Sequence, residues 1–278
     1  MKSWQEIGFE IEITGDGSPS LRLLTSVDPS KDRGESMHHS GGAASETDLI
    51  YGEPIREIFG KISKPHFLVV GLGLGYIELV IAREALRAGV GAGTSSGVEV
   101  GLITSYESVP ELRESFFGWL HGEALGAEIQ QIYDLVLEHV LKGAESTAVP
   151  TLASASSPAP RSTSSAPDLS PSSVKSFLRQ HFSKIEDIRG ALHSEVTLES
   201  KYHCILYDAF SSKTSPFLWE EDFLNRLLAS GTSEQSVLST YACKGTLKRA
   251  LKNQGFEVFA REGFKGKRNS TLAKKNLK

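Results

Sequence analysis

The amino-acid sequence predicts an α/β fold with a Rossmann-like sheet, and two observations support this prediction. First, the apolar run Phe67–Val70 is bounded by Pro65 and Gly71, as expected of a buried parallel strand. Second, further apolar runs alternate with segments of helical periodicity, which is the order of elements in a sheet covered by helices. An alternating apolar and polar segment near the N-terminus predicts a β-hairpin extension before the sheet.

A glycine-rich turn, Gly71–Gly75, joins the first strand of this sheet to a helix. Leu79, Ala82 and Leu86 recur at helical spacing, so the helix is expected to begin just after Gly75. Such a turn lets backbone N–H groups approach a ligand at the helix N-terminus. The spacing is GxGxG and not the GxGxxG of dinucleotide sites, which favours S-adenosylmethionine (SAM) over NAD. A turn that only packs the strand against the helix is the alternative.

The whole chain is interpreted as an N-terminal hairpin and cap segment over residues 1–60 and a main domain over residues 61–278. Residues 144–173 are almost all Ser, Ala, Pro and Thr. Because such a segment cannot bury enough apolar surface to offset its ordering entropy, it is predicted to be a disordered insertion. Strands are predicted at 8–14, 21–24, 102–106, 201–207, 236–241, 256–261 and 270–273, and helices at 45–59, 110–121, 127–141, 220–229 and 244–254. Order is expected to resume at 174–182, after the insertion.

Charge is unevenly distributed along the chain. The whole sequence carries a formal net charge of −4, but from Lys244 onwards there are 11 Lys and Arg residues against two acidic ones. A basic end on an acidic body suits a polyanionic partner, although a solvated basic tail would look the same.

The location and metal content are also predicted from composition. The first ten residues have no basic and apolar signal regions, and no stretch approaches a membrane span. Cys204 and Cys243 lie in apolar runs and are predicted to be buried, without a disulfide framework. We therefore expect a cytoplasmic protein. His38 and His39 are adjacent but have no Cys, Asp or Glu cluster at ligand spacing, so no metal site is predicted.

Acidic residues follow several of the predicted strands. Glu107 ends the strand at 102–106, where nucleotide-binding α/β folds place an acid that accepts the ribose hydroxyls; Glu99 is the alternative. Asp187 and Asp208 also lie at predicted strand ends. Because ligands bind outside the carboxyl ends of the strands, these acids and the glycine turn should meet at one edge of the sheet.

Several stretches together resemble the methyltransferase domain of the MnmC family, which modifies the wobble uridine of tRNA. Three positions depart from the family pattern: Val69 replaces an acid, Ser215 replaces an Asn, and Asn269 replaces an acid. The matching stretches are 15–18 (GDGS), 34–43 (GESMHHSGGA), 71–75 (GLGLG), Glu107, 208–211 (DAFS), 216–219 (PFLW), 239–241 (STY), 255–256 (GF) and 263–268 (GFKGKR).

The resemblance implies a class I SAM-dependent methyltransferase that converts 5-aminomethyl-2-thiouridine at the wobble position of tRNA into 5-methylaminomethyl-2-thiouridine. It implies that Asp208 is the catalytic residue beside the substrate amine. The family's fused flavin oxidase domain has no room in 278 residues, so a flavin-dependent oxidase partner would be separate or absent. The implied cofactor-binding residues are Gly71, Gly73, Gly75, Glu107, Asp187, Met37 and His39, and the implied substrate-binding residues are Phe210, Trp219, Tyr241, Lys265, Lys267 and Arg268.

Other functions stay open at this point. An aminopropyltransferase like spermidine synthase would share the fold but would not need the basic C-terminal end. A non-catalytic RNA-binding module could keep the fold after losing SAM affinity. The GxGxG spacing and the lack of a convincing hydride-site histidine disfavour an NAD-dependent dehydrogenase.

Overall fold

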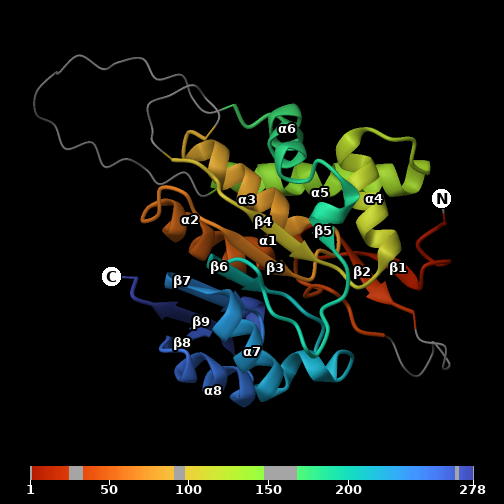
Figure 1. Cartoon of the computed structure of the whole chain (residues 1–278). Helices are drawn as coiled ribbons and strands as arrows, with labels where there is room; N and C mark the ends of the chain where they lie inside the picture. The colour runs from red at the N-terminus through yellow and green to blue at the C-terminus, as the bar shows by residue number, and fades with distance from the viewer. Residues whose placement is uncertain (1, 25–33, 91–97, 147–167, 267–268, 278) are drawn as a thin grey trace, which may run out of the picture.

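The computed structural model describes residues 2–24, 34–90, 98–146, 168–266 and 269–277, and its centre is a seven-stranded sheet (Figure 1). The first five strands in the spatial order are parallel neighbours, and the last two run antiparallel to each other. In spatial order the strands are β5 (Ile188–Arg189), β4 (Ile103–Tyr106), β3 (Phe67–Val70), β6 (Tyr202–Tyr207), β7 (Thr232–Thr240), β9 (Asn269–Lys275) and β8 (Glu257–Glu262).

Helices cover both faces of the sheet (Figure 1). Phe67 and Val69 of β3 belong to the apolar core on one face, and Leu68 and Val70 to the core on the other, because successive side chains of a strand alternate. The first face carries α2 (Glu53–Phe59), α3 (Tyr76–Arg87), α4 (Pro110–His121), α5 (Ala127–Ser146) and α6 (Pro171–His181), and the second carries α7 (Glu221–Gly231) and α8 (Gly245–Asn253).

An N-terminal hairpin packs against the first face. β1 (Phe9–Ile13) pairs antiparallel with β2 (Pro19–Leu23), as predicted. The carboxylate of Asp16, in the turn between them, accepts hydrogen bonds from the backbone N–H and the hydroxyl of Ser45, at 3.0 and 2.7 Å. This contact attaches the hairpin to the first turn of α1 (Ala43–Thr47). The predicted fold class, a Rossmann-like sheet with a hairpin extension, is confirmed.

Local sequence explains where the helices begin and end. Pro110 and Pro171 occupy the first turns of α4 and α6, where a missing backbone N–H costs no hydrogen bond. The hydroxyl of Ser170 accepts a hydrogen bond from the backbone N–H of Ser173 and caps α6. Gly122 ends α4 in the left-handed conformation, with φ of 74°.

The predicted disordered insertion at 144–173 overlaps the end of α5 and the start of α6, and its residues 147–167 lie outside the described part of the chain. The division at residue 60 stays a prediction. Cys204 is buried as predicted, but the prediction for Cys243 is wrong, because this residue lies in the loop after β7 and is exposed.

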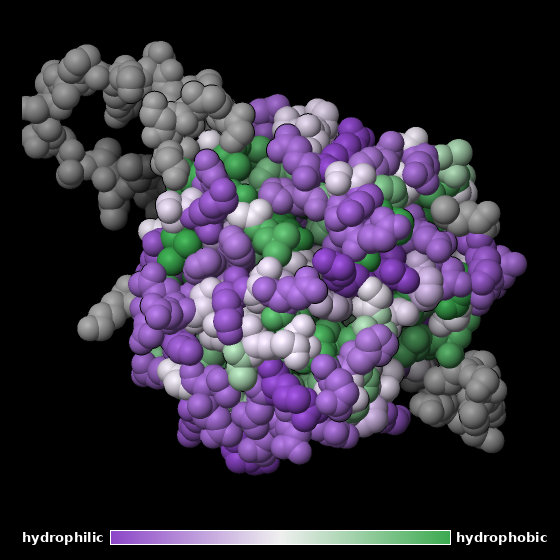
Figure 2. Space-filling view, viewed as in Figure 1, coloured by the Kyte–Doolittle hydropathy of each residue, from purple (hydrophilic) through white to green (hydrophobic). Residues whose placement is uncertain are grey.

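The face of the molecule seen in Figure 2 is mainly hydrophilic, and its apolar residues form small separate patches. Hydrophilic residues are dense in the lower part of this view, where α8 lies in Figure 1. Within the described ranges, every helix is too short or too polar to span a lipid bilayer.

The helix predicted at 45–59, with an interruption near Pro54, forms as three consecutive pieces. α1 passes into a π-helical turn, η1 (Asp48–Gly52), which passes directly into α2. Pro54 lies in the first turn of α2. The interruption is therefore the wide π-helical turn just before the proline, and such turns recur at functional sites.

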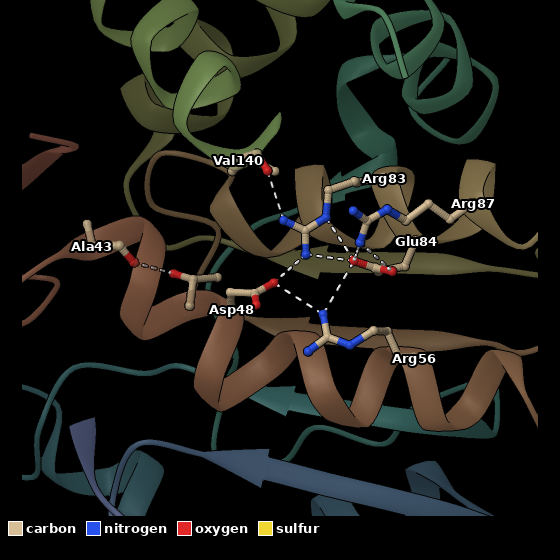
Figure 3. Close-up of polar contacts among 8 residues, drawn as sticks. Ala43, Asp48, Arg56, Arg83, Glu84, Arg87 and Val140 are labelled. Atoms are coloured by element: carbon tan, nitrogen blue, oxygen red, sulfur yellow. Dashed lines mark hydrogen bonds and ion pairs between the residues drawn. The ribbon is translucent and has the colours of Figure 1, made fainter. Parts of the chain in front are cut away.

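A buried polar cluster holds this π-helical turn against α3 and α5 (Figure 3). The Arg83 side chain is only 1% exposed. Its guanidinium donates to the Glu84 carboxylate and to the backbone carbonyl of Val140, both at 2.8 Å, and pairs with Asp48. Arg56 of α2 also contacts Asp48, at 3.2 Å. Because a buried charge is costly without its partners, this cluster fixes the position of η1.

Candidate functional site

The carboxyl ends of β3, β4 and β6 open into a cavity of about 430 Å³. The residues that directly follow these strands, Gly71, Glu107 and Asp208, all line it. In open α/β sheets ligands bind at this edge, so the cavity lies where the strand-end pattern predicts a site. The rest of its wall includes residues 35–38 and 191–192, part of η1, and part of the loop after β6.

The glycine turn brings backbone close to other segments at two points. Gly71 has φ of 97°, and a Cβ atom there would lie 2.5 Å from the backbone oxygen of Asp208. Gly75 has φ of 77°, and a Cβ atom there would lie 2.2 Å from the ring of Phe116. Both positions therefore need glycine, for conformation and for space. Gly71 and Gly73 line the cavity, whereas Gly75 lies behind the wall and caps α3.

Glu107 connects the second strand of the site to the glycine turn. Its side chain is 7% exposed, and its Oε2 accepts a hydrogen bond from the backbone N–H of Gly73 at 3.0 Å. Its Oε1 accepts from the N–H of Val109 at 2.9 Å. Burial raises the pKa of Glu107 above its ordinary value, while these backbone donors act in the opposite direction. Glu99, the alternative, is largely exposed and pairs with Lys64.

Asp208 is held in place by two segments distant in sequence. Its backbone N–H donates to the carbonyl of Val70 at 2.8 Å, which continues the pairing of β6 with β3. Its carboxylate Oδ1 accepts a hydrogen bond from the hydroxyl of Tyr51 at 2.5 Å. Tyr51 lies in η1 and was not predicted, because a π-helical turn has no periodic signature in the sequence.

The segment after the hairpin forms another part of the wall. Met37 and Glu35 both line the cavity, and a role for Met37 in cofactor binding stays a prediction. The Glu35 carboxylate accepts hydrogen bonds from the backbone N–H and the hydroxyl of Ser211, both at 2.9 Å. This contact ties the N-terminal segment to the loop that carries Asp208.

His39 does not line the cavity, whereas its neighbour His38 does, and a role for His39 in cofactor binding stays a prediction. His39 Nδ1 accepts the backbone N–H of Gly41, and its ring packs on Phe264 with centroids 5.5 Å apart. His38 lines the cavity, and its Nδ1 lies 2.9 Å from the hydroxyl of Ser20. The two adjacent histidines therefore have different surroundings, His38 at the cavity and His39 against Phe264.

Of the three predicted aromatic contacts, two lie on the cavity wall. Phe210 and Tyr241 line it, but Trp219 does not. Trp219 is 3% exposed, and its indole N–H donates to the backbone oxygen of Phe210 at 2.7 Å. It therefore supports Phe210 from behind, and a contact of Trp219 with substrate stays a prediction. Phe217, which the sequence analysis missed, lines the cavity and is 36% exposed.

Asp187 does not reach the cavity wall. It ends a short 3₁₀ turn, η2 (Ile185–Asp187), and so precedes β5 and does not follow it. Its Oδ2 accepts hydrogen bonds from the backbone N–H of Lys184 at 3.0 Å and from the hydroxyl of Ser183 at 3.1 Å. The expectation of an acid at this strand end is therefore wrong. Ala191 and Leu192 line the cavity there.

The basic C-terminal region is partly neutralised by the acidic body. Lys274 pairs with Glu57 at 2.7 Å, and Arg249 pairs with Glu221 at 2.7 Å. Lys265 is exposed, and its ammonium donates to the backbone oxygen of Gly41 at 2.7 Å, outside the cavity wall. Lys267 and Arg268 lie outside the described residues.

The cavity wall carries a strongly negative set of side chains. Glu35, Glu46, Glu107 and Asp208 line it, and no Lys or Arg is found in the wall among the described residues. Opposite charges attract strongly in such a partly enclosed space, whereas a phosphate would be repelled. The cavity therefore suits a cationic ligand.

Glu78 is a buried acid just behind the site. Its side chain is fully buried, and Oε1 accepts a hydrogen bond from the hydroxyl of Ser105 at 2.6 Å. Oε2 has no hydrogen-bond partner within the described part of the chain. Burial raises the pKa of Glu78 from 4.5 to about 8. The carboxyl is therefore neutral in the folded protein at neutral pH.

This pKa predicts a specific pH dependence of stability. Between pH 4.5 and about 8 the folded protein binds one proton more than the unfolded chain, so the free energy of unfolding falls as the pH rises through that window. The slope from Glu78 should be about 1 kcal/mol per pH unit. In Glu78→Gln this contribution should vanish. Urea unfolding of both proteins at about pH 5.5 and about pH 7.5 measures it. Parallel pH dependence in the two proteins would contradict the assignment.

The comparison with known families gives a match over the C-terminal part of this structure. Residues 178–276 match the family model described as S-adenosyl-L-methionine-dependent methyltransferase. This stretch includes β6, Asp208 and Tyr241. The predicted SAM-dependent methyltransferase resemblance is confirmed. SAM is the cofactor of this family, as the sequence predicted.

Two curated relatives share shorter stretches with this methyltransferase sequence. An uncharacterised protein of Methanocaldococcus jannaschii is 35% identical over 78 residues, which are 28% of this chain and 22% of that protein. The tRNA 5-methylaminomethyl-2-thiouridine biosynthesis bifunctional protein MnmC of Hahella chejuensis is 37% identical over 65 residues, 23% of this chain and 10% of that protein. The chain thus spans less than a quarter of the length of either relative.

A solved structure shows the same methyltransferase fold. The crystal structure of MnmC2 from Aquifex aeolicus superposes with a TM-score of 0.54 and 22% sequence identity. The match covers 98% of this chain and 70% of that one, so it includes the N-terminal hairpin as well as the sheet. The likeness confirms the class I methyltransferase architecture.

The cavity fits the methyltransferase cofactor in space and in charge. The close backbone at Gly71 leaves room that a Cβ atom would fill, and the carboxylates of Glu35, Glu46 and Glu107 complement a sulfonium and an ammonium group. Val69, which replaces an acid of the family pattern, is fully buried in the core of the first face. The exchange of the family's acid for Val69 therefore does not change the set of carboxylates that line the cavity.

Proposed function

We propose that this protein is a SAM-dependent N-methyltransferase that acts on 5-aminomethyl-2-thiouridine at the wobble position of tRNA. The observation that carries the proposal is the acidic cavity, in which the Asp208 carboxylate lies directly after β6 and beside the glycine turn. A sulfonium donor and an amine acceptor are both favoured by such a cavity. The name of the matching Hahella chejuensis protein contains the product nucleoside, 5-methylaminomethyl-2-thiouridine, and we infer the substrate as the same nucleoside without the transferred methyl group.

Asp208 would orient the substrate amine. SAM would supply an activated methyl group, and positive charge would pass to the attacking nitrogen as the bond forms. The carboxylate stabilises that charge and fixes the direction of the lone pair. As a general base, a carboxyl with a pKa of about 4 would face about 7 kcal/mol in taking a proton from an alkylammonium of pKa about 9. We therefore propose that the amine first loses its proton to water.

The charge of the wall also limits how RNA could bind. Because four carboxylates line the cavity without a compensating Lys or Arg from the described residues, phosphates should stay outside and only the base should enter. Such a mode requires the wobble base to leave the anticodon stack. Phe210, Tyr241 and Phe217 are the aromatic side chains of the loop after β6 and the end of β7 that could stack on it.

The decisive experiment is mass spectrometry of nucleosides from tRNA that carries 5-aminomethyl-2-thiouridine, after incubation with the protein and SAM. We expect 5-methylaminomethyl-2-thiouridine to form only when SAM is present, and the rate to fall steeply with added salt because tRNA phosphates contact basic residues. The same tRNA lacking the aminomethyl group is the control. If the nucleoside pool is unchanged while the protein binds SAM, the proposed substrate is wrong.

An aminopropyltransferase like spermidine synthase is the second candidate, because the same acidic wall would bind a polyamine. Incubation with decarboxylated SAM and putrescine separates the two candidates. Formation of an aminopropylated polyamine, without inhibition by added tRNA, would favour the aminopropyltransferase. Calorimetry with SAM and S-adenosylhomocysteine tests a non-catalytic RNA-binding module, which should bind neither. We also propose that the flavin-dependent oxidase step belongs to a separate protein and that the enzyme works in the cytoplasm, with its tRNA.

A further inference from the structure

Tyr51 is the buried neighbour of the proposed catalytic carboxylate. It lines the cavity, is 2% exposed, and donates its hydroxyl hydrogen to Asp208 Oδ1 at 2.5 Å. Burial, followed by the nearby charge of Asp208, raises the pKa of the Tyr51 hydroxyl well above its ordinary value. The hydroxyl therefore stays protonated and remains a donor to the carboxylate.

The backbone that carries Tyr51 is fixed from two directions. The preceding carbonyl, that of Ile50, accepts hydrogen bonds from the Ser239 hydroxyl at 2.5 Å and from the Arg261 guanidinium at 3.0 Å. These donors come from β7 and β8, on the far side of β6 from β3. Four residues further on, where a regular α-helix would supply the donor for that carbonyl, Pro54 has no N–H, so the carbonyl is available to these donors from the sheet.

The other end of η1 is fixed by the polar cluster of Figure 3. Asp48, the first residue of η1, pairs with the buried Arg83 of α3. One side of the π-helical turn is thus bound to α3 and the other to the sheet. A turn anchored on both sides holds the backbone of Tyr51 in place, and the Tyr51 side chain lies toward Asp208.

We propose that Tyr51 is a positioning residue, which the anchored π-helical turn holds so that its hydroxyl orients the Asp208 carboxylate toward the substrate amine. The inference rests on the proposed role of Asp208 and adds a residue to it. Without the hydroxyl, the carboxylate would lose this donor, and its orientation toward the amine would be less well defined. Positioning of this kind acts on the rate of the reaction more than on cofactor affinity.

The test compares Tyr51→Phe with Tyr133→Phe in the methylation assay. Tyr133 is also fully buried, but its hydroxyl donates to the backbone oxygen of Leu112 at 3.5 Å and it does not line the cavity. In Tyr51→Phe we expect kcat to fall by about 10- to 100-fold and KM for SAM to change by less than about twofold. Tyr133→Phe should keep its kcat. Equal kcat in Tyr51→Phe and the wild type would overturn the inference.

A double variant shows whether Tyr51 acts through Asp208. If it does, Tyr51→Phe should have little further effect on kcat in an Asp208→Asn background. If the two losses multiply, Tyr51 acts in some other way and the inference is wrong.

A binding measurement keeps the inference testable even if the tRNA assay fails. Sinefungin carries an amine in place of the methyl group that SAM transfers, whereas S-adenosylhomocysteine carries nothing there. Calorimetry should show that Tyr51→Phe lowers the affinity for sinefungin by about 10-fold and changes the affinity for S-adenosylhomocysteine by less than about twofold. Equal weakening of both ligands would overturn the role of Tyr51. An inactive wild type with this selective loss would instead count against the proposed substrate alone.

Discussion

Replacing Asp208 by Asn is expected to lower kcat for methyl transfer by at least about 100-fold, with the affinity for SAM changed by less than about twofold. The amide keeps the shape of the side chain but removes the negative charge that stabilises the positive charge developing on the amine. It also receives the Tyr51 hydroxyl on its oxygen as before, so the local packing should persist. The loss should therefore fall on the reaction and spare the fold.

Single-turnover assays and calorimetry with SAM measure these two quantities for Asp208→Asn. Asp222→Asn is a matched control, because Asp222 is exposed in the first turn of α7 and does not line the cavity. Unchanged turnover in Asp208→Asn would remove this carboxylate from the mechanism. A parallel loss of SAM affinity would make it a cofactor ligand.

Replacing Gly75 by Ala is expected to lower the free energy of unfolding by about 3–4 kcal/mol. The residue has φ of 77°, and an added Cβ atom would lie 2.2 Å from the ring of Phe116. Phe116 is itself fully buried and packs against Trp119 and Tyr133, with ring centroids 5.9 and 6.0 Å apart. The ring cannot move aside without opening the core of the first face.

Gly122→Ala separates the two components of this cost. Gly122 has φ of 74°, and an added Cβ atom there would meet nothing within 4 Å. Gly122→Ala should therefore lower the free energy of unfolding only by the backbone component, about 1–2 kcal/mol. Equilibrium urea unfolding gives both values. If Gly75→Ala costs no more than Gly122→Ala, the contact with Phe116 is not the reason for glycine at this position.

The fold could be predicted from the sequence because its elements carry strong local signals. The central strand Phe67–Val70 is buried on both faces and is therefore an unbroken apolar run. The helix Pro110–His121 has a proline in its first turn and a glycine just after its end, and its predicted bounds are those of α4. Tertiary packing did not have to override these local preferences.

The candidate site could be predicted only where strand ends fix positions. Glu107 and Asp208 follow well-marked strands and lie at the cavity, as the topology requires. Asp187 adjoins a strand of two residues, which is too short to give a pattern from which its end could be read. Tyr51 depends on a π-helical turn whose shape is set by distant partners. The choice between His38 and His39 also depends on contacts distant in sequence, such as that with Phe264.

The order of strands has a consequence for how the chain can assemble as it leaves the ribosome. β8 is made before β9, yet β9 lies between β7 and β8 in the sheet. β8 therefore has no neighbour to pair with until the later strand has emerged, and the far edge of the sheet must close in one late step. Arg261 lies in β8 and binds the carbonyl of Ile50, so the segment that presents Tyr51 gains this anchor only after β9 has been made and has paired with β8.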